Sequence, residues 1–315
     1  MEQSTAPEPT YHIPALLPQA LEGLDIKPSG VYVDCTLGGG GHTRAILRLL
    51  DARAGGRLLS FDQDCEAIAR AESDAELSGN AAFTAVHGNF RYLRNFLRYY
   101  GADSVDGILA DLGVSFHHFD DPGRGFSFRW DGPLDMRMNP QAERSAATLL
   151  AEASPERLAE IFRLYGELPQ ARQLAKAIDR RRSESPITTV EDLLATVRPL
   201  ISPRREKKEL AQVFQALRIE VNDEIAALRS LLEQALKVLR PGGRLAVITY
   251  HSLEDRLVKN FMRTGNLEGK AEKDFFGRSL SPLRPLTSKA VTPDADEVER
   301  NPRSRSAKLR VAERL

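Results

Sequence analysis

The first 111 residues of this 315-residue chain alternate short apolar runs with amphipathic helical segments. Each apolar run has the length of a buried strand and is bounded by glycine or polar residues. The predicted strands cover 31–35, 57–62, 82–87 and 105–111, and the predicted helices cover 42–50, 65–77 and 90–99. This alternation of strands and helices is typical of parallel strands joined by right-handed helical crossovers. The sequence therefore predicts an α/β fold with a doubly wound, mostly parallel sheet.

The strand pattern stops after Asp111 and gives way to a long aperiodic segment that ends near Asn139. Segments of this length inside a compact domain are typically functional, and the many aromatic residues argue against disorder. From 142 to 216 the spacing of apolar residues is helical, and no strand signal is present. This stretch is predicted to be an all-helical insertion.

Capping signals place several helix starts in and after this insertion. Ser154 followed by Pro155 is a typical N-cap and first-turn proline. Thr188 and Glu191 have the spacing of a capping box, and Asp223 can cap a helix whose apolar stripe runs to a Pro-Gly-Gly stop at 241–243.

Strand candidates return at 244–250, near Leu280 and at 307–311. We therefore predict one discontinuous α/β domain, formed by residues 1–140 and 218–315. It is interrupted by a helical insert over 141–217.

Composition limits the class of protein. The chain is 42% hydrophobic and 28% charged, which is typical of a globular protein and excludes disorder as its main state. Cys35 and Cys65, its two cysteines, form no CxxC pair and are too few for a secreted disulfide framework. The N-terminal segment lacks a signal-peptide pattern, and no apolar run has membrane-spanning length. These features predict a cytoplasmic protein without a membrane partner.

The net charge is zero, with 44 Lys and Arg against 44 Asp and Glu, so no global positive field attracts nucleic acid. Basic residues do gather locally, at 180–182, 204–208 and 300–314. Such runs are solvated helix faces in many proteins, and that interpretation stays open beside a phosphate-binding one.

A glycine-rich turn follows the first predicted strand. Gly38 to Gly41 lie between the strand-ending Asp34 and a helix start, where free backbone amides attract anionic groups. Asp62 ends the second predicted strand, where a carboxylate can accept hydrogen bonds from ribose hydroxyls. The combination indicates a nucleoside-containing cofactor. NAD and S-adenosylmethionine both remain candidates, although the run does not follow the GxGxxG spacing of a dinucleotide site.

The fourth predicted strand ends in Asp111. A carboxylate at this edge of a parallel sheet lies beside the crevice where ligands bind. An alternative interpretation is that Asp111 only initiates a turn.

Several longer motifs occur in order along the chain. They lie at 12–17, 34–43, 106–115, 124–128, 133–138, 214–219, 221–224, 251–256 (HSLEDR) and 301–310 (NPRSRSAKLR). Through them the chain resembles, from about Tyr11 to Arg314, the bacterial 16S rRNA (cytosine-N4)-methyltransferase family, RsmH/MraW.

The resemblance implies a class I methyltransferase domain interrupted by a helical domain for RNA recognition. It also implies S-adenosyl-L-methionine as methyl donor and a cytidine in the decoding region of 16S rRNA, within the small ribosomal subunit, as target, with no DNA partner. The cofactor-binding residues carried over by motif are Gly40, Gly41, His42, Asp62, Phe90, Asp111 and His118. His118 departs from the family pattern, in which glutamine is common at this position.

Cytosine N4 is a poor nucleophile because its lone pair is delocalised into the ring. The enzyme must therefore orient the amine and accept its proton, and we predict Asp111 as the acceptor. His251 is a second candidate for proton removal, with a structural histidine as the alternative. No residue cluster has metal-site spacing, so no catalytic metal is predicted.

An extruded base is commonly held between aromatic side chains. The candidates are Phe126, Phe128, Trp130 and Tyr250. The alternative for Phe126 and Phe128 is that they fix the loop to the core.

Phosphate contacts are predicted from Arg303 and Arg305 in the basic C-terminal segment, together with basic residues of the insert. The zero net charge favours a structured RNA that is recognised by shape. Three rival functions stay open: an NAD-dependent oxidoreductase, a non-catalytic ribosome-assembly factor that binds RNA, and a methyltransferase for DNA or a small molecule.

Overall fold

The computed structural model describes residues 14–315, so His12 and Ile13 of the first motif lie outside the described residues. Two compact units are present: unit 1 comprises 14–62, 66–113 and 231–315, and unit 2 comprises 63–65 and 114–230. Unit 2 is larger than the predicted insert. The difference arises because Phe126, Leu134 and Met136 of the loop before the insert are buried in the helical core.

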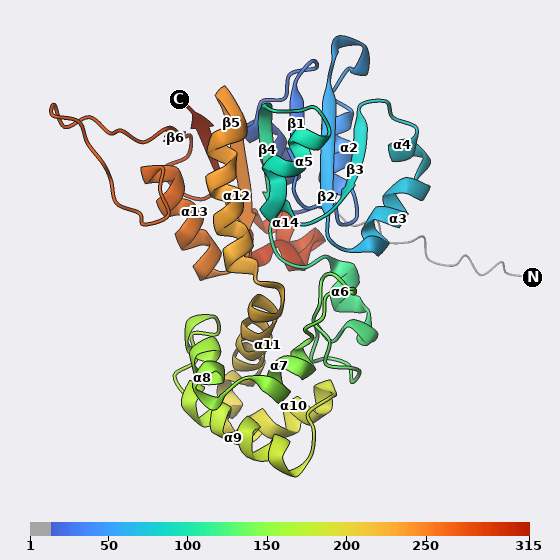
Figure 1. Ribbon diagram of the computed structural model, residues 1–315, viewed down its shortest axis with the longest axis vertical. Helices are drawn as coiled ribbons and strands as arrows, with labels where there is room; N and C mark the ends of the chain where they lie inside the picture. Colours follow the sequence, from blue (N-terminus) through green and yellow to red (C-terminus); the bar gives the residue numbers. More distant parts are fainter. Residues whose placement is uncertain (1–13) are drawn as a thin grey trace, which may run out of the picture. The chain divides into compact units, whose positions relative to one another are not determined.

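Unit 1 contains a seven-stranded sheet in the order β3-β2-β1-β4-β5-β7-β6 (Figure 1). The strands are β1 (Val31–Asp34), β2 (Arg57–Asp62), β3 (Phe83–His87), β4 (Val105–Asp111), β5 (Leu239–Thr249), β6 (Leu283–Pro285) and β7 (Lys308–Arg314). The first five are parallel, while β7 is antiparallel to both β5 and β6. The predicted doubly wound, mostly parallel sheet is confirmed.

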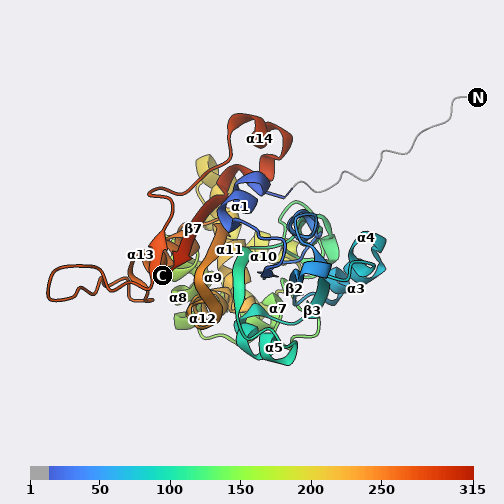
Figure 2. The same ribbon diagram turned by 90° about the horizontal axis from the view of Figure 1, so that it is seen from above.

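Helices flank both faces of this sheet, with α1 on one side and α5 on the other in Figure 2. The helices assigned here are α1 (Leu17–Leu24), α2 (Gly41–Leu47), α3 (Cys65–Ser73), α4 (Ala75–Ser78), α5 (Leu93–Tyr99), α13 (Ser252–Thr264) and α14 (Ala295–Arg300). The helix α12 (Glu224–Val238) begins in unit 2 and ends in unit 1. Leu24 of α1 and Ile46 of α2 join Leu58, Leu109 and Ala246 of the strands in one buried apolar cluster. This packing fixes the carboxyl ends of the parallel strands relative to one another.

Unit 2 is helical. Its helices are α6 (Phe116–Asp120), α7 (Ala146–Glu152), α8 (Pro155–Leu164), α9 (Ala171–Glu184), α10 (Val190–Val197) and α11 (Glu206–Asn222). Leu158, Ile161, Leu174, Ile178 and Phe214 belong to its buried core, at the helical spacing that the sequence predicted.

The capping predictions had different outcomes. Ser154 caps α8 as predicted, by accepting a hydrogen bond from the backbone N–H of Arg157. The predicted capping box was wrong by one residue, since Thr189 and Asp192 form it instead of Thr188 and Glu191. Asp223 ends α11 with φ 50° and directly precedes α12, and its carbonyl accepts a hydrogen bond from the backbone N–H of Ala227 (3.0 Å); side-chain capping by Asp223 stays a prediction.

No helix in the described part of the chain combines the length and the apolar character that a membrane span requires.

Candidate active site

The turn after β1 is held by the buried carboxylate of Asp34. Its Oδ1 accepts a hydrogen bond from the backbone N–H of Thr36 (3.0 Å), and its Oδ2 accepts one from the hydroxyl of Thr43 in α2 (2.7 Å). The Thr43 hydroxyl also lies 2.8 Å from the hydroxyl of Ser60 in β2. These contacts join the ends of two strands to the start of α2.

The glycines of this turn are required by its geometry. Gly38 has φ 48° and Gly40 has φ 76°, a left-handed conformation that side chains disfavour. A Cβ on Gly41 would lie 2.9 Å from Cγ of Pro14. The backbone therefore passes through a space that only glycine fits, and it leads directly into His42 of α2.

Asp62 and Phe90 occupy the ends of the next two strands. Oδ2 of Asp62 accepts a hydrogen bond from the backbone N–H of Gly38 (2.9 Å), which ties the end of β2 to the glycine turn. Phe90 begins a short 3-10 helix (Phe90–Tyr92) after β3, capped by the side chain of Asn89, and is half-buried. Both residues lie at the sheet edge where the sequence placed them.

Asp111 ends β4 and is held from three sides. Its backbone N–H donates to the hydroxyl of Thr36 (2.8 Å), its Oδ1 accepts from the phenol of Tyr250 (2.8 Å), and its Oδ2 lies 3.7 Å from Nδ1 of His42. Burial raises the pKa of Asp111 to about 6, while the charge of His42 and the Tyr250 hydrogen bond oppose the rise. Asp111 is thus a constrained carboxylate that titrates near neutral pH.

Tyr250 follows β5 and responds to the same carboxylate. Burial and then the negative charge of Asp111 raise the pKa of the Tyr250 phenol well above its usual value. The phenol therefore stays protonated and remains a hydrogen-bond donor.

A buried histidine and a glutamate lie at the start of α13. Glu254 accepts a hydrogen bond from the backbone N–H of Tyr250 (3.1 Å), and its other oxygen lies 3.2 Å from Nε2 of His251. Neither ring nitrogen of His251 makes a hydrogen bond with acceptable geometry to any residue that the structure describes. Sequence analysis missed Glu254 and Thr36, although each lies within four residues of a predicted site residue.

His118 lies in unit 2. Its Nδ1 is 3.1 Å from the hydroxyl of Ser115, and its Nε2 is 2.7 Å from the buried carboxylate of Asp64. Arg124 is also buried there, and it donates to Asp64 (3.2 Å) and to the carbonyls of Arg137 and Met138. Sequence analysis missed Asp64 and Arg124, because no local pattern marks such a long-range charge pair.

The predicted stacking aromatics divide into two groups. Phe126 is 3% exposed in the core of unit 2, and the ring of Phe128 packs against Phe214 with centroids 5.5 Å apart. This geometry matches the alternative that both fix the loop to the core. Trp130 is 56% exposed, and Tyr250 contacts Asp111.

The basic C-terminal segment is part of the fold. Arg310 in β7 is bound to Asp255 of α13 (2.7 Å), and Arg303 and Arg305 lie on an exposed 3-10 helix (Pro302–Ser306) just before that strand. Arg303 and Arg305 are both exposed, whereas the Arg310 guanidinium is held by Asp255.

Comparison with known proteins identifies the family. A model of the MraW methylase family matches residues 9–315. The "Ribosomal RNA small subunit methyltransferase H" proteins of Parabacteroides distasonis and Bacteroides thetaiotaomicron are each 57% identical to this chain, over 97% and 98% of it and 98% of their own lengths. A solved rRNA methylase structure from Streptococcus thermophilus is 10% identical, with a TM-score of 0.41 over 94% of both chains. The family match and the identity of the relatives show that the chain is a member of the MraW methylase family.

Proposed function

We propose that this protein transfers a methyl group from S-adenosyl-L-methionine to the N4 amine of a cytidine in 16S rRNA, within the small ribosomal subunit. The observation that carries the proposal is the carboxylate of Asp111, placed beside the glycine turn and the phenol of Tyr250 at the strand ends of unit 1. Relatives that share 57% of their residues with this chain are named as small-subunit rRNA methyltransferases.

The residues of unit 1 fit this cofactor. Gly40 and Gly41 carry no side chain that would obstruct a ligand at this turn, and Gly40 requires its positive φ of 76°. A carboxylate has lone pairs for several donors, so Asp62 can bind ribose hydroxyls while it holds Gly38. His42, Phe90 and Asp111 complete the set proposed in unit 1. His118, also predicted as a cofactor contact, lies in unit 2. When bound, the cofactor supplies an electrophilic methyl group.

The chemistry requires a proton acceptor. As the bond from N4 to the methyl carbon forms, the sulfur–carbon bond breaks and its electron pair stays on sulfur, and N4 loses one proton. The ionised Asp111 takes this proton and becomes a carboxylic acid. Because its pKa is about 6, Asp111 is ionised at pH 7.5 and basic enough to assist.

Tyr250 has two separable roles in this scheme, and two variants distinguish them. Tyr250→Phe keeps the ring but removes the hydrogen bond to Asp111, so the pKa of Asp111 rises and the acid limb of the kcat profile moves up by about one pH unit. Tyr250→Leu loses ring stacking as well and should raise KM for RNA. Identical acid limbs for the wild type and Tyr250→Phe would contradict the role of the phenol.

His251 is the second proposed proton-transfer group. Its Nε2 lies 3.2 Å from Glu254, and neither ring nitrogen makes a hydrogen bond to the described residues, so a ring nitrogen can contact substrate.

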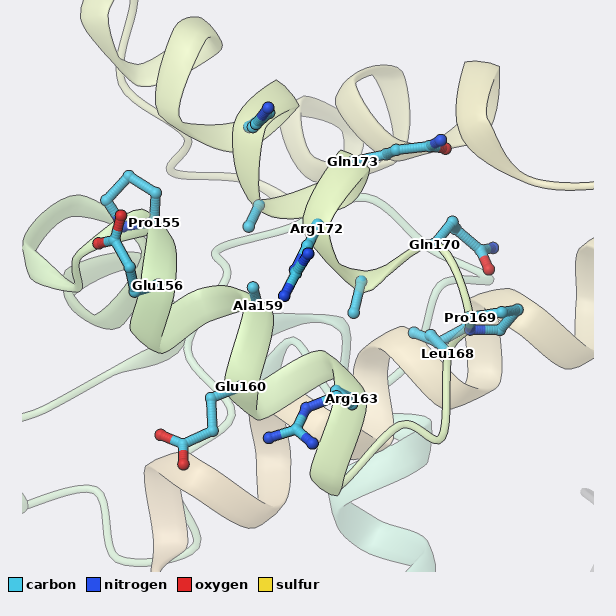
Figure 3. Close-up of a pocket in the computed structure, with 13 residues that line it drawn as sticks. Pro155, Glu156, Ala159, Glu160, Arg163, Leu168, Pro169, Gln170, Arg172 and Gln173 are labelled. Carbon is cyan, nitrogen blue, oxygen red and sulfur yellow. The ribbon is translucent and has the colours of Figure 1, made fainter.

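We propose that unit 2, with Trp130, binds the RNA. A hollow of about 1050 Å³ lies between α8 and α9, and Figure 3 shows the side chain of Arg172 reaching toward Ala159 of the facing helix. Arg172, Lys176 and Arg180 follow one another at intervals of four residues along α9, and all are exposed. This spacing places three cations on one face of the helix, which suits an RNA phosphate backbone.

Two arginines of the predicted 180–182 patch serve the fold instead. Arg182 donates to the carbonyls of Leu150 and Ala153 at the end of α7, and Arg181 contacts Asp192. We therefore assign the proposed RNA contacts to Arg172, Lys176 and Arg180 of α9. Arg303 and Arg305 of unit 1 are proposed as further contacts.

Charge reversal on α9 tests this surface. Arg172→Glu with Lys176→Glu should raise KM for RNA at least tenfold and reduce the salt slope of binding by about one per lost phosphate contact. The affinity for S-adenosylmethionine should not change. Arg53→Glu, at an exposed position of unit 1, is the matched control, and an equal effect from both variants would contradict a specific role of α9.

The reaction class is tested by calorimetry and label transfer. S-adenosylmethionine should bind and NADH should not, and labelled methyl should appear in rRNA. Binding of NADH alone would support an oxidoreductase. If the protein binds RNA but transfers no label, and Asp111→Asn binds RNA equally well, the result would support a non-catalytic assembly factor. Label found in DNA alone would show that DNA is the acceptor.

A further inference from the structure

A hairpin extends from unit 1 between α13 and β6. It begins after Gly265, where α13 ends, and its two arms pair through an antiparallel bridge between Lys273 and Ser279. The backbone N–H of Leu280 donates to the carbonyl of Glu272 (3.0 Å). Figures 1 and 2 both show this segment extending away from the sheet of unit 1.

The tip of the hairpin is fixed by Asp274 and Gly277. Oδ1 of Asp274 accepts hydrogen bonds from the backbone N–H groups of Phe276 (2.9 Å) and Arg278 (2.8 Å), and its carbonyl accepts one from Gly277 (3.0 Å). Gly277 has φ 80°, which suits a short hairpin loop. The turn thus holds the two residues at its apex in a defined position.

Those two residues are phenylalanines. Phe275 is 98% exposed and Phe276 is 80% exposed, although both have apolar rings. The rings contact each other edge to face, with centroids 5.7 Å apart, and the guanidinium of Arg278 lies 5.9 Å from the ring of Phe276. The chain therefore presents an edge-to-face aromatic pair with an adjacent cation to solvent.

We propose that this tip, residues 274–278, is a second RNA contact that stacks on unpaired bases. The inference rests on the proposed function, because RNA is its ligand, but it concerns a surface outside the methyl-transfer site. Every nucleobase offers a planar face, and aromatic rings with a neighbouring arginine bind such faces without sequence preference.

The size and surroundings of the tip favour RNA bases over a protein partner. Two phenylalanines bury at most about 300–500 Å² together, whereas a stable protein interface needs about 800 Å² from each partner. The neighbouring exposed side chains are charged or polar: Glu272 and Lys273 on one arm, and Arg278 and Ser279 on the other. Among the described residues of the hairpin, Leu280 is the one other large apolar side chain that is exposed (57%), so little apolar surface is available to a protein partner.

Fluorescence and binding of a ten-nucleotide oligouridylate test the proposal in the full chain. Phe275→Ala with Phe276→Ala should weaken this single strand by roughly tenfold or more. Phe275→Trp should retain binding. The oligonucleotide should quench the tryptophan fluorescence of this variant more than that of the wild type, whose one tryptophan is Trp130. A fully paired RNA duplex should show no dependence on the tip.

Phe275→Leu with Phe276→Leu is the matched control, because leucine keeps apolar surface but loses stacking. RNA binding should fall in this variant. Wild-type affinity for oligouridylate in either double variant would overturn the proposal. The proposal would also be overturned if sedimentation showed a dimer that persists in the double leucine variant and is lost in the double alanine variant. Because wild-type methylation of rRNA is measured in parallel, failure of the tip and failure of the proposed reaction give different results.

Discussion

Replacing Asp111 with asparagine should lower kcat by about a hundredfold to a thousandfold, because the group that accepts the amine proton is lost. Asparagine keeps the size of the side chain and an oxygen that can accept the Tyr250 hydrogen bond. Because Asp111 is also among the predicted cofactor-binding residues, the loss in kcat is measured at saturating cofactor and cofactor affinity is measured separately. Single-turnover methyl transfer with the wild type and the variant measures the loss.

The same substitution should stabilise the protein at neutral pH. The pKa of Asp111 is about 6 in the fold and 3.8 ordinarily, so ionising this carboxylate costs folding free energy. The cost is absent below pH 3.8 and fully present above pH 6, where it is about 2–3 kcal/mol. Asp111→Asn should therefore raise the free energy of unfolding at pH 7.5, and the gain should shrink as the pH falls toward 4.

Urea unfolding at several pH values measures this effect. Asp103→Asn, at an exposed position before β4, is the matched control and should change neither activity nor stability. A destabilised Asp111→Asn at pH 7.5 would contradict the account, because it would mean that the ionised carboxylate is favoured by the fold. Full activity in this variant would remove Asp111 from the reaction.

Replacing Arg124 with leucine should destabilise unit 2 by about 3–5 kcal/mol. Arg124 is 8% exposed and donates to the carboxylate of Asp64, which is 1% exposed. It also satisfies the carbonyls of Arg137 and Met138. Its removal leaves a buried negative charge that faces His118 without the guanidinium.

Hydrogen exchange resolved by segment measures this loss, because amides of the unit 2 helices should lose protection more than those of the unit 1 strands. Arg129→Leu is the control: Arg129 is exposed in the same loop and should change the free energy of unfolding by less than about 0.5 kcal/mol. Equal effects of the two substitutions would contradict a specific role of the buried pair.

Much of the sheet could be predicted because its strands are bounded by strong local signals. The predicted bounds of β2 and β4 are those of the structure, since each run is apolar and ends in an aspartate. The start of β5 was predicted too late, at 244, because Pro-Gly-Gly was interpreted only as a helix stop. In the structure this segment continues the strand, with a register shift between Val105 and Gly107 of β4.

The candidate site was predictable where it depends on strand ends, because parallel strands bring their carboxyl ends to one edge. Asp62, Asp111 and Tyr250 are such residues. The partners that tune them were not predictable, because Thr36 and Glu254 act through side-chain geometry that no periodicity reports. The burial of Phe126 likewise depends on how the long loop packs against helices that follow it in the sequence.

The most direct test of the central claim is mass spectrometry of nucleosides from small ribosomal subunits and free 16S rRNA after reaction with labelled S-adenosylmethionine. The account predicts labelled N4-methylcytidine at one position, formed by the wild type and lost in Asp111→Asn. Label on another atom or another nucleoside, or equal labelling by the variant, would contradict it.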